Sequence, residues 1–375
     1  MKRTLSKLLA LVLIVTVIGA MAAVPAMASE SPAAFGGYTA IGGTTNFNKN
    51  LVINSDANVP NVTFSFAITD GTAVDDSGSA IQILASGATL TGVTPTVTFT
   101  GDETTTAGKP GEVTPSDGYK YATLPVTITF PEGTFAKPGV YRFKLTETEG
   151  TLPGITYDES TLYLDVFVVA DDSDVLSIAS CILRPSEANI SLDGVYASDP
   201  DVKTADFTNQ VTQFDFEFTK TIAGNQGDKS KVFTFTLNVS NALPGSYPVV
   251  VNNVTGAEAS ITVGEDGKGE ATFSMTHNSS VKVVGLNKGA RCVVTEANED
   301  YTPSYLVDEE TEGTTNTSTV NLINSGHKVD FTNTRTGVIP TGILLTVAPF
   351  AVGLLLFGSI VIFLAAKKRR AEDED

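Results

Sequence analysis

Residues 214–222 read FDFEFTKTI, an alternation of apolar and polar side chains that is typical of a half-buried β-strand. The same period of two recurs in short runs along the chain, including VTFSFAI from residue 62, LPVTITF from residue 124 and KVFTFTL from residue 231. Gly, Pro, Asn and Asp separate the runs, as expected for turns. The pattern predicts an all-β protein of antiparallel strands packed as β-sandwiches, rather than α/β layers.

The body of the chain repeats itself once. Each half opens on a strand with a single lysine, has a later strand that ends in Thr-Glu, and closes on Asp-Phe-Thr-Asn. An internal repeat of this kind indicates two similar domains. We therefore predict one β-sandwich over residues 29–210 and a second over residues 211–336, with the boundary near Gln210 to Gln213.

The charge of the chain argues against nucleic-acid binding. The 375-residue chain has a formal net charge of −18, and a surface this acidic repels phosphate backbones, so we expect no nucleic-acid partner.

The chain has two cysteines, Cys181 and Cys292, which lie far apart in apolar stretches. They would be two buried thiols in separate domains or, alternatively, a single disulfide bridge.

The first 28 residues have a basic start, an apolar run and small residues at Ala26 and Ala28. These features predict a secretory signal peptide cleaved after Ala28. An N-terminal membrane anchor is the alternative, but the apolar run is short and is followed by Pro25. The protein is therefore expected to be exported.

The last 39 residues, 337–375, form a second targeting region. An uncharged stretch over residues 343–366 is long enough to cross a bilayer as a helix, and four basic residues follow it. The pentapeptide VIPTG at residues 338–342 stands directly before this span, and the arrangement resembles a sortase sorting signal. The resemblance implies cleavage between Thr341 and Gly342 by sortase, attachment to cell-wall peptidoglycan, and a membrane-bound state only for the unprocessed precursor.

Each half places an amine, a carboxyl group and a carboxamide on core-facing strand positions, because residues two apart in a strand share a face. These residues are Lys49, Glu147 and Asn209 in the first half and Lys220, Glu296 and Asn333 in the second. One interpretation is a buried ion pair with Asn as a hydrogen-bond neighbour. The other is covalent: a desolvated, neutral Lys attacks the Asn carboxamide while a protonated Glu polarises its carbonyl and shuttles protons.

The order of Lys, Thr-Glu and Phe-Thr-Asn resembles the isopeptide-forming domains of Gram-positive shaft pilins, relatives of the immunoglobulin-like collagen-adhesin B-type sandwich. The resemblance also covers FAKPGVYRFKLTE from residue 135 and LPGITYDESTLYLDVFV from residue 152. It implies a Lys49–Asn209 and a Lys220–Asn333 cross-link, each joining the first strand of a domain to its last. It further implies a cell-surface pilus subunit joined covalently, head to tail, to neighbouring pilins.

A polymer needs an accepting amine on each subunit. Lys203 lies six residues before Asn209, close to where resembling pilins carry their linking lysine, although their Tyr-Pro-Lys motif is absent here. The alternative is that Lys203 is an ordinary solvated lysine. Lys109 is the second candidate, on the segment 104–117 that composition predicts to be a mobile loop.

No cofactor, metal site or catalytic site for an external substrate is expected. The two histidines, His277 and His327, lack further ligands at metal-binding spacing, and the acidic stretch from Asp171 to Asp174 is better explained as a turn than as a calcium site. A sortase-polymerised shaft subunit is thus the favoured function. A monomeric wall-anchored adhesin, or a basal or tip pilin using these domains as a stalk, is the alternative.

Overall fold

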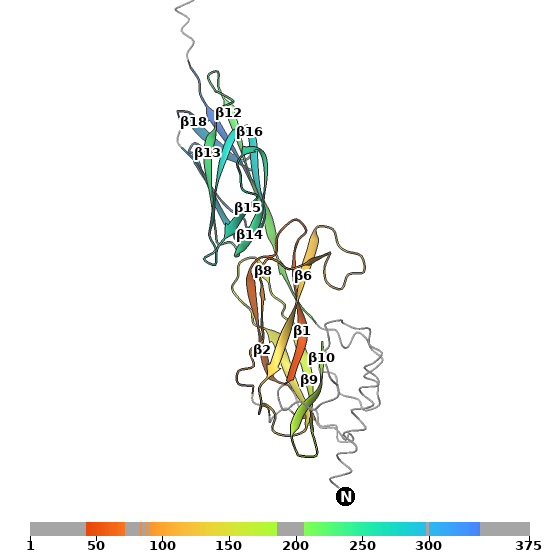
Figure 1. The fold of residues 1–375 in the computed structure, drawn as a ribbon. Coiled ribbons are helices and arrows are strands. Elements are labelled where there is room, and N and C mark those ends of the chain that lie inside the picture. Colours follow the sequence, from red (N-terminus) through yellow and green to blue (C-terminus); the bar gives the residue numbers. More distant parts are fainter. Residues whose placement is uncertain are drawn as a thin grey trace, which may run out of the picture.

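The structure is a computed structural model that describes residues 43–71, 83–84, 88, 90–185, 206–297 and 300–337. Within these ranges the regular secondary structure is all β-strand, arranged as two domains that follow one another along the molecule (Figure 1). The predicted signal peptide and membrane span lie outside the described residues. None of the described residues belongs to a helix that could cross a membrane.

The N-terminal domain is a sandwich of two sheets with the orders β5-β6-β1-β11-β8 and β10-β9-β7-β2-β4, and β3 pairs with β7. Alternate residues of both sheets point inward; β2, for example, buries every second residue from Val62 to Ile68. The strands are β1 (Gly43–Asn54), β2 (Val62–Asp70), β3 (Ile83–Leu84), β4 (Thr96–Phe99), β5 (Thr105–Ala107), β6 (Tyr119–Phe130), β7 (Gly139–Glu147), β8 (Ile155–Thr156), β9 (Thr161–Ala170), β10 (Leu176–Arg184) and β11 (Phe207–Val211).

The C-terminal domain is one continuous hydrogen-bonded sheet, β19-β18-β21-β12-β16-β13-β17-β20, with β14 and β15 beside β16. β16 pairs with β13 through Gly269–Met275 and with β12 through Ser279–Asn287, so this long strand belongs to both layers of the sandwich. The strands are β12 (Gln213–Ala223), β13 (Phe233–Ser240), β14 (Gly245–Thr255), β15 (Ser260–Val263), β16 (Gly269–Asn287), β17 (Arg291–Glu296), β18 (Thr302–Val307), β19 (Thr311–Gly313), β20 (Thr317–Asn321) and β21 (His327–Thr334).

The first and last strands of each domain pair in parallel: β1 with β11, and β12 with β21. Parallel neighbours cannot be joined by a tight turn, so the whole remaining domain lies between them in sequence. This topology brings together residues that are more than 100 positions apart.

A short joint connects the domains. Gln213, the first residue of β12, accepts a hydrogen bond from the backbone N–H of Asn54 (2.9 Å) and donates one to the carbonyl of Gly285 (2.9 Å). Leu243, which precedes β14, is 1% exposed and packs into the hydrophobic core of the N-terminal domain. The joint is therefore apolar at its centre and hydrogen-bonded around it.

The segment 104–117 is more ordered than its composition predicts. Residues Thr105–Ala107 form β5, which pairs antiparallel with β6, and the Glu112 carboxylate accepts hydrogen bonds from the backbone N–H groups of Lys109 and Ser116 (both 2.9 Å). Composition predicted a mobile loop, but it could not reveal that a sheet edge was available for pairing.

Cys181 on β10 and Cys292 on β17 are both free thiols in separate domains, which excludes a bridge between them in this structure. Cys292 is buried as expected, whereas Cys181 is only half-buried. Burial raises the pKa of each thiol to about 12. Both cysteines are therefore protonated, unreactive packing residues at neutral pH.

Candidate functional site

The strand pairing places Lys49 and Asn209 side by side. In the parallel ladder of β1 and β11, Lys49 lies opposite Phe207 and Leu51 lies opposite Asn209. Glu147 is the last residue of β7 in the facing sheet, so it reaches the same point from across the core. The side chains of Lys49 and Glu147 are fully buried, and Asn209 is 0% exposed.

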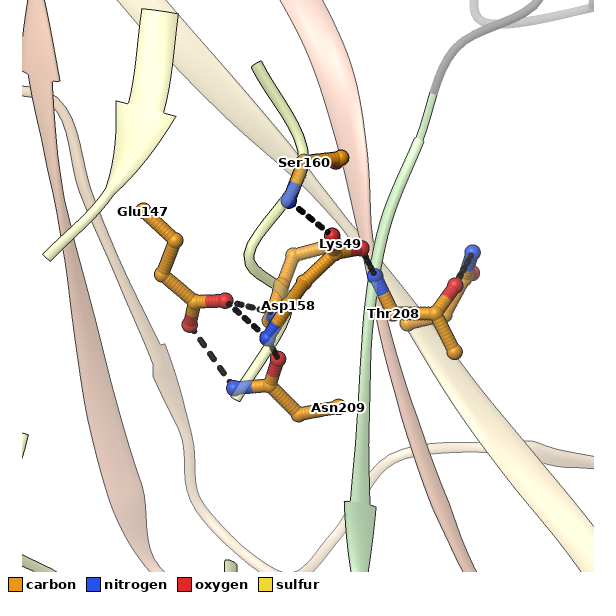
Figure 2. A network of polar contacts seen from close by, with 7 residues as sticks. Lys49, Glu147, Asp158, Ser160, Thr208 and Asn209 are labelled. Atoms are coloured by element: carbon orange, nitrogen blue, oxygen red, sulfur yellow. Dashed lines mark hydrogen bonds and ion pairs between the residues drawn. The ribbon is translucent and has the colours of Figure 1, made fainter. Parts of the chain in front are cut away.

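The Glu147 carboxylate lies between the other two groups, with one oxygen facing each (Figure 2). Lys49 Nζ is 2.8 Å from Glu147 Oε2, and Asn209 Nδ2 is 2.7 Å from Glu147 Oε1. Burial lowers the pKa of Lys49, and its hydrogen bond to Glu147 opposes that shift. The amine is also 4.9 Å from the centre of the Phe64 ring, so its surroundings are apolar apart from its polar partners.

The carbonyl oxygen of Asn209 accepts a hydrogen bond from the backbone. The N–H of Asp158 donates to Asn209 Oδ1 at 2.8 Å and makes a longer contact of 3.3 Å with Glu147 Oε2. The Asp158 carboxylate accepts from the backbone N–H groups of Thr208 (2.6 Å) and Ser160 (2.9 Å). Figure 2 shows Asp158 between Ser160 and the triad, on the loop that follows β8. The role of Asp158 is not predictable from the sequence, because a backbone donor leaves no signature in the residue type.

The second triad repeats the arrangement in the C-terminal domain. Lys220 lies opposite Phe331 and Ile222 opposite Asn333, the same register as in the first domain. Lys220 Nζ and Asn333 Nδ2 are each 2.6 Å from Glu296 Oε1. Burial lowers the pKa of Lys220 to about 8, although its hydrogen bond to Glu296 acts in the opposite direction.

The structure thus brings together all six predicted triad residues, in two groups of three. In one respect it differs from the expectation: each glutamate contacts the amide nitrogen of its asparagine, not the carbonyl oxygen. A carboxyl group placed between the amine and the amide nitrogen is suited to passing a proton from one nitrogen to the other.

The candidates for subunit joining are less well described. Lys203, Thr341 and Gly342 lie outside the described residues. Lys109 is half-buried, with its amine 4.1 Å from the centre of the Tyr119 ring. A cation held against an aromatic face is less available than a freely solvated amine.

A second buried charged cluster, which the sequence analysis missed, lies in the N-terminal domain. Arg142 on β7 forms a two-point contact with Asp165 on β9 (2.7 and 3.0 Å), and Arg184 on β10 lies 3.2 Å from the same carboxylate. These side chains occupy neighbouring strands of one sheet, and the two arginines share the one carboxylate. The cluster ties three strands together and lacks the carboxamide that distinguishes the two triads.

Comparisons with known proteins find similar domains and a similar chain. Residues 45–212 match the family model described as a Spy0128-like isopeptide-containing domain, and residues 215–335 match a model described as a domain of unknown function. The chain is 27% identical to a curated pilin of Streptococcus pyogenes serotype M1 over 333 residues, covering 85% of this chain and 89% of the relative.

Solved structures show the same fold. The major pilin of Streptococcus pyogenes matches with a TM-score of 0.51 and 23% identity, covering 78% of this chain and 99% of that one. The T3.2 major pilin from the same species matches with a TM-score of 0.53 and 18% identity, covering 78% and 97% of the two chains.

The fold, the triads and these matches define a class: cell-surface pilins of Gram-positive bacteria built from β-sandwich domains of the isopeptide-containing type. Within it, this chain is a structural subunit of the pilus-shaft kind.

Proposed function

We propose that each domain forms an intramolecular isopeptide bond, Lys49–Asn209 in the first and Lys220–Asn333 in the second. The observation that carries this proposal is the same buried arrangement in both domains, with amine and carboxamide on parallel first and last strands and one carboxylate touching both nitrogens. A purely structural ion pair would need no asparagine at that position.

The reaction is an amide exchange that needs no external reactant. The lysine ammonium gives a proton to the glutamate, and the neutral amine attacks Cγ of the asparagine, forming the new C–N bond while the carbonyl electron pair moves to Oδ1. The glutamic acid then protonates the amide nitrogen, and its carboxylate accepts one of the two protons of the attacking nitrogen, which keeps the other as the N–H of the new amide. The old C–N bond breaks, the carbonyl re-forms and ammonia leaves.

Fixed geometry supplies much of the reduction in the activation barrier of this reaction, because the reacting groups need not find each other in solution. Proteolysis and mass spectrometry of the chain over residues 29–341 test the proposal. We expect the peptide that contains Lys49 to be joined to the peptide that contains Asn209, and likewise for Lys220 and Asn333. Recovery of all four as separate peptides would refute it.

We further propose that sortase cleaves between Thr341 and Gly342 and joins Thr341 to Lys203 of the next subunit, the last subunit being joined to peptidoglycan. Two observations support an acyl donor that follows the end of the C-terminal domain. β21 runs parallel to β12, which starts at the joint, so β21 ends on the side away from the N-terminal domain. There Asn225 exchanges two hydrogen bonds with Gly337, both 2.9 Å, which fixes the exit of the chain.

Head-to-tail joining of this kind is heterologous and does not close, so it produces a fibre. In cells that express the matching sortase, wild-type protein should give a ladder of high-mass species that survives boiling in detergent. Lys203→Arg should abolish the ladder, whereas Lys109→Arg should leave it intact. The opposite result would make Lys109 the amine that is joined to the next subunit. A single wall-linked species in wild type would favour a monomeric adhesin or a basal or tip pilin.

A further inference from the structure

The two triads differ in how the carboxylate oxygens contact the two nitrogens and, with more consequence for the reaction, in the surroundings of the asparagine carbonyl oxygen. In the first domain Asn209 Oδ1 accepts a hydrogen bond from the backbone N–H of Asp158. In the second, Asn333 Oδ1 is buried without a hydrogen-bond partner among the described residues. This oxygen takes on negative charge when an amine adds to the carboxamide.

The difference originates in the neighbouring strands. In the first domain β8 pairs with β11 only through Gln210 and Val211, and the chain then leaves the ladder. There the Asp158 carboxylate accepts a hydrogen bond from the backbone N–H of Thr208, in place of a strand partner. This contact directs the Asp158 N–H toward Asn209. In the second domain β18 stays paired with β21 from Thr302 to Val307.

By the strand register, Ser304 is the counterpart of Asp158, because Thr302 lies opposite Thr334 as Thr156 lies opposite Gln210. Pro303 lies directly opposite Asn333, and proline has no N–H to offer. The next residue, Ser304, is paired with Thr332 within the regular ladder and directs its hydroxyl to the Thr332 carbonyl (3.3 Å). The loop conformation that frees a backbone donor in the first domain is thus absent from the described part of the second.

We propose that the backbone N–H of Asp158 is the oxyanion donor for Lys49–Asn209 bond formation, and that the Asp158 side chain is a positioning group that aims it. The inference rests on the proposed isopeptide chemistry and deepens it. It divides the work between two partners: Glu147 moves protons between the two nitrogens, and the Asp158 N–H stabilises the charge on oxygen. Preorganised backbone donors of this kind give large rate effects because they need no rearrangement during the reaction.

The Asp158 carboxylate has a clear role in this arrangement. Its two oxygens hold the N–H groups of Thr208, next to Asn209, and of Ser160, on the far side of the loop. These contacts fix the Asp158 peptide relative to the strand that carries the reacting carboxamide. Loss of the side chain would leave the donor present but poorly aimed, which is a smaller defect than loss of the N–H itself.

The sharpest test replaces only the N–H. Cell-free synthesis of residues 29–341 with the α-hydroxy acid analogue of aspartate at position 158 substitutes an ester oxygen for the donor and keeps the side chain. Samples are quenched in denaturant at timed intervals and digested, and both cross-linked peptides are quantified. The Lys220–Asn333 bond in the same chain is an internal control for folding and timing.

We expect the ester at position 158 to slow Lys49–Asn209 formation by about 100-fold, the usual size of effect for one oxyanion donor. Lys220–Asn333 formation should be unchanged. An ester at Ser160 is the matched control, because it removes one hydrogen bond of the same loop, 2.9 Å long, but leaves the donor in place. Asp158→Ala should slow the reaction by an intermediate factor.

Two results would overturn the inference: a wild-type rate for Lys49–Asn209 in the ester variant, or a loss no greater than that of the Ser160 ester. Failure of the underlying chemistry looks different, since wild-type chain would then give neither cross-linked peptide.

Discussion

Lys49 and Asn209 lie on adjacent parallel strands, with Lys49 opposite Phe207, so that Asn209 is the next residue of β11 facing the same side. Lys220 and Asn333 repeat this relationship in the second domain. A bond between each pair would connect the two terminal strands of a domain directly. Tension applied along the fibre would then pass through covalent bonds and bypass the strands between them.

Removing Glu147 should destabilise the N-terminal domain strongly. Glu147→Ala would prevent the cross-link, which in the loop-closure treatment of disulfides is worth about 4–5 kcal/mol for so long a loop. It would also leave the buried Lys49 without its partner, at a further cost of about 3–5 kcal/mol. Calorimetry should show the N-terminal transition at a much lower temperature.

Glu159→Ala is the control for this substitution, because Glu159 is an exposed glutamate close in sequence to the same site. It should leave both transitions unchanged. If Glu147→Ala were equally silent, neither a cross-link nor a buried pair could be contributing to stability.

The pKa of Lys220 predicts a pH dependence in protein that cannot cross-link. In Asn333→Ala the lysine stays free, and burial lowers its pKa to about 8 in the folded state, against 10.5 for an unperturbed lysine. The unfolded chain therefore binds more protons between these values. The free energy of unfolding should rise with pH from about 8 to about 10.5, by at most about 1.4 kcal/mol per unit.

Denaturant unfolding of the C-terminal domain at several pH values measures this slope. The double variant Asn333→Ala, Lys220→Met lacks the titrating amine and should lose the added slope. A single variant whose stability fell over the same pH interval would show that the lysine is not held with a lowered pKa.

The joint predicts that a residue of the second domain stabilises the first. Leu243 is 1% exposed and belongs to the core of the N-terminal domain. Leu243→Ala should lower the stability of the N-terminal domain by about 2–5 kcal/mol, as for other buried leucines. Leu237→Ala, a buried leucine of the second core, should instead lower only the C-terminal transition. Equal effects of the two substitutions on the C-terminal domain alone would argue against a shared core at the joint.

Much of this architecture is predictable from the alternation of apolar and polar residues along the strands. The period of two in the chain assigns Lys49, Glu147 and Asn209 to inward faces, and the repeated order of residues pairs them with Lys220, Glu296 and Asn333. Because a buried charge requires a partner, the residue types themselves indicate that the three groups meet.

Other features depend on geometry that residue types do not encode. The Asp158 donor exists because the chain leaves a ladder at one position, and Leu243 joins the other core because of how the domains dock. The Arg142–Asp165 pair was missed because strand order decides which side chains become neighbours. In each case the deciding information is the arrangement of strands or domains in three dimensions.

The intact mass of residues 29–341 decides whether each chain forms two bonds by itself. Each bond releases one ammonia, so we expect a mass about 34 Da below that of the sequence, and a deficit of about 17 Da in either Glu147→Ala or Glu296→Ala. A wild-type mass equal to that of the unmodified sequence would contradict this expectation.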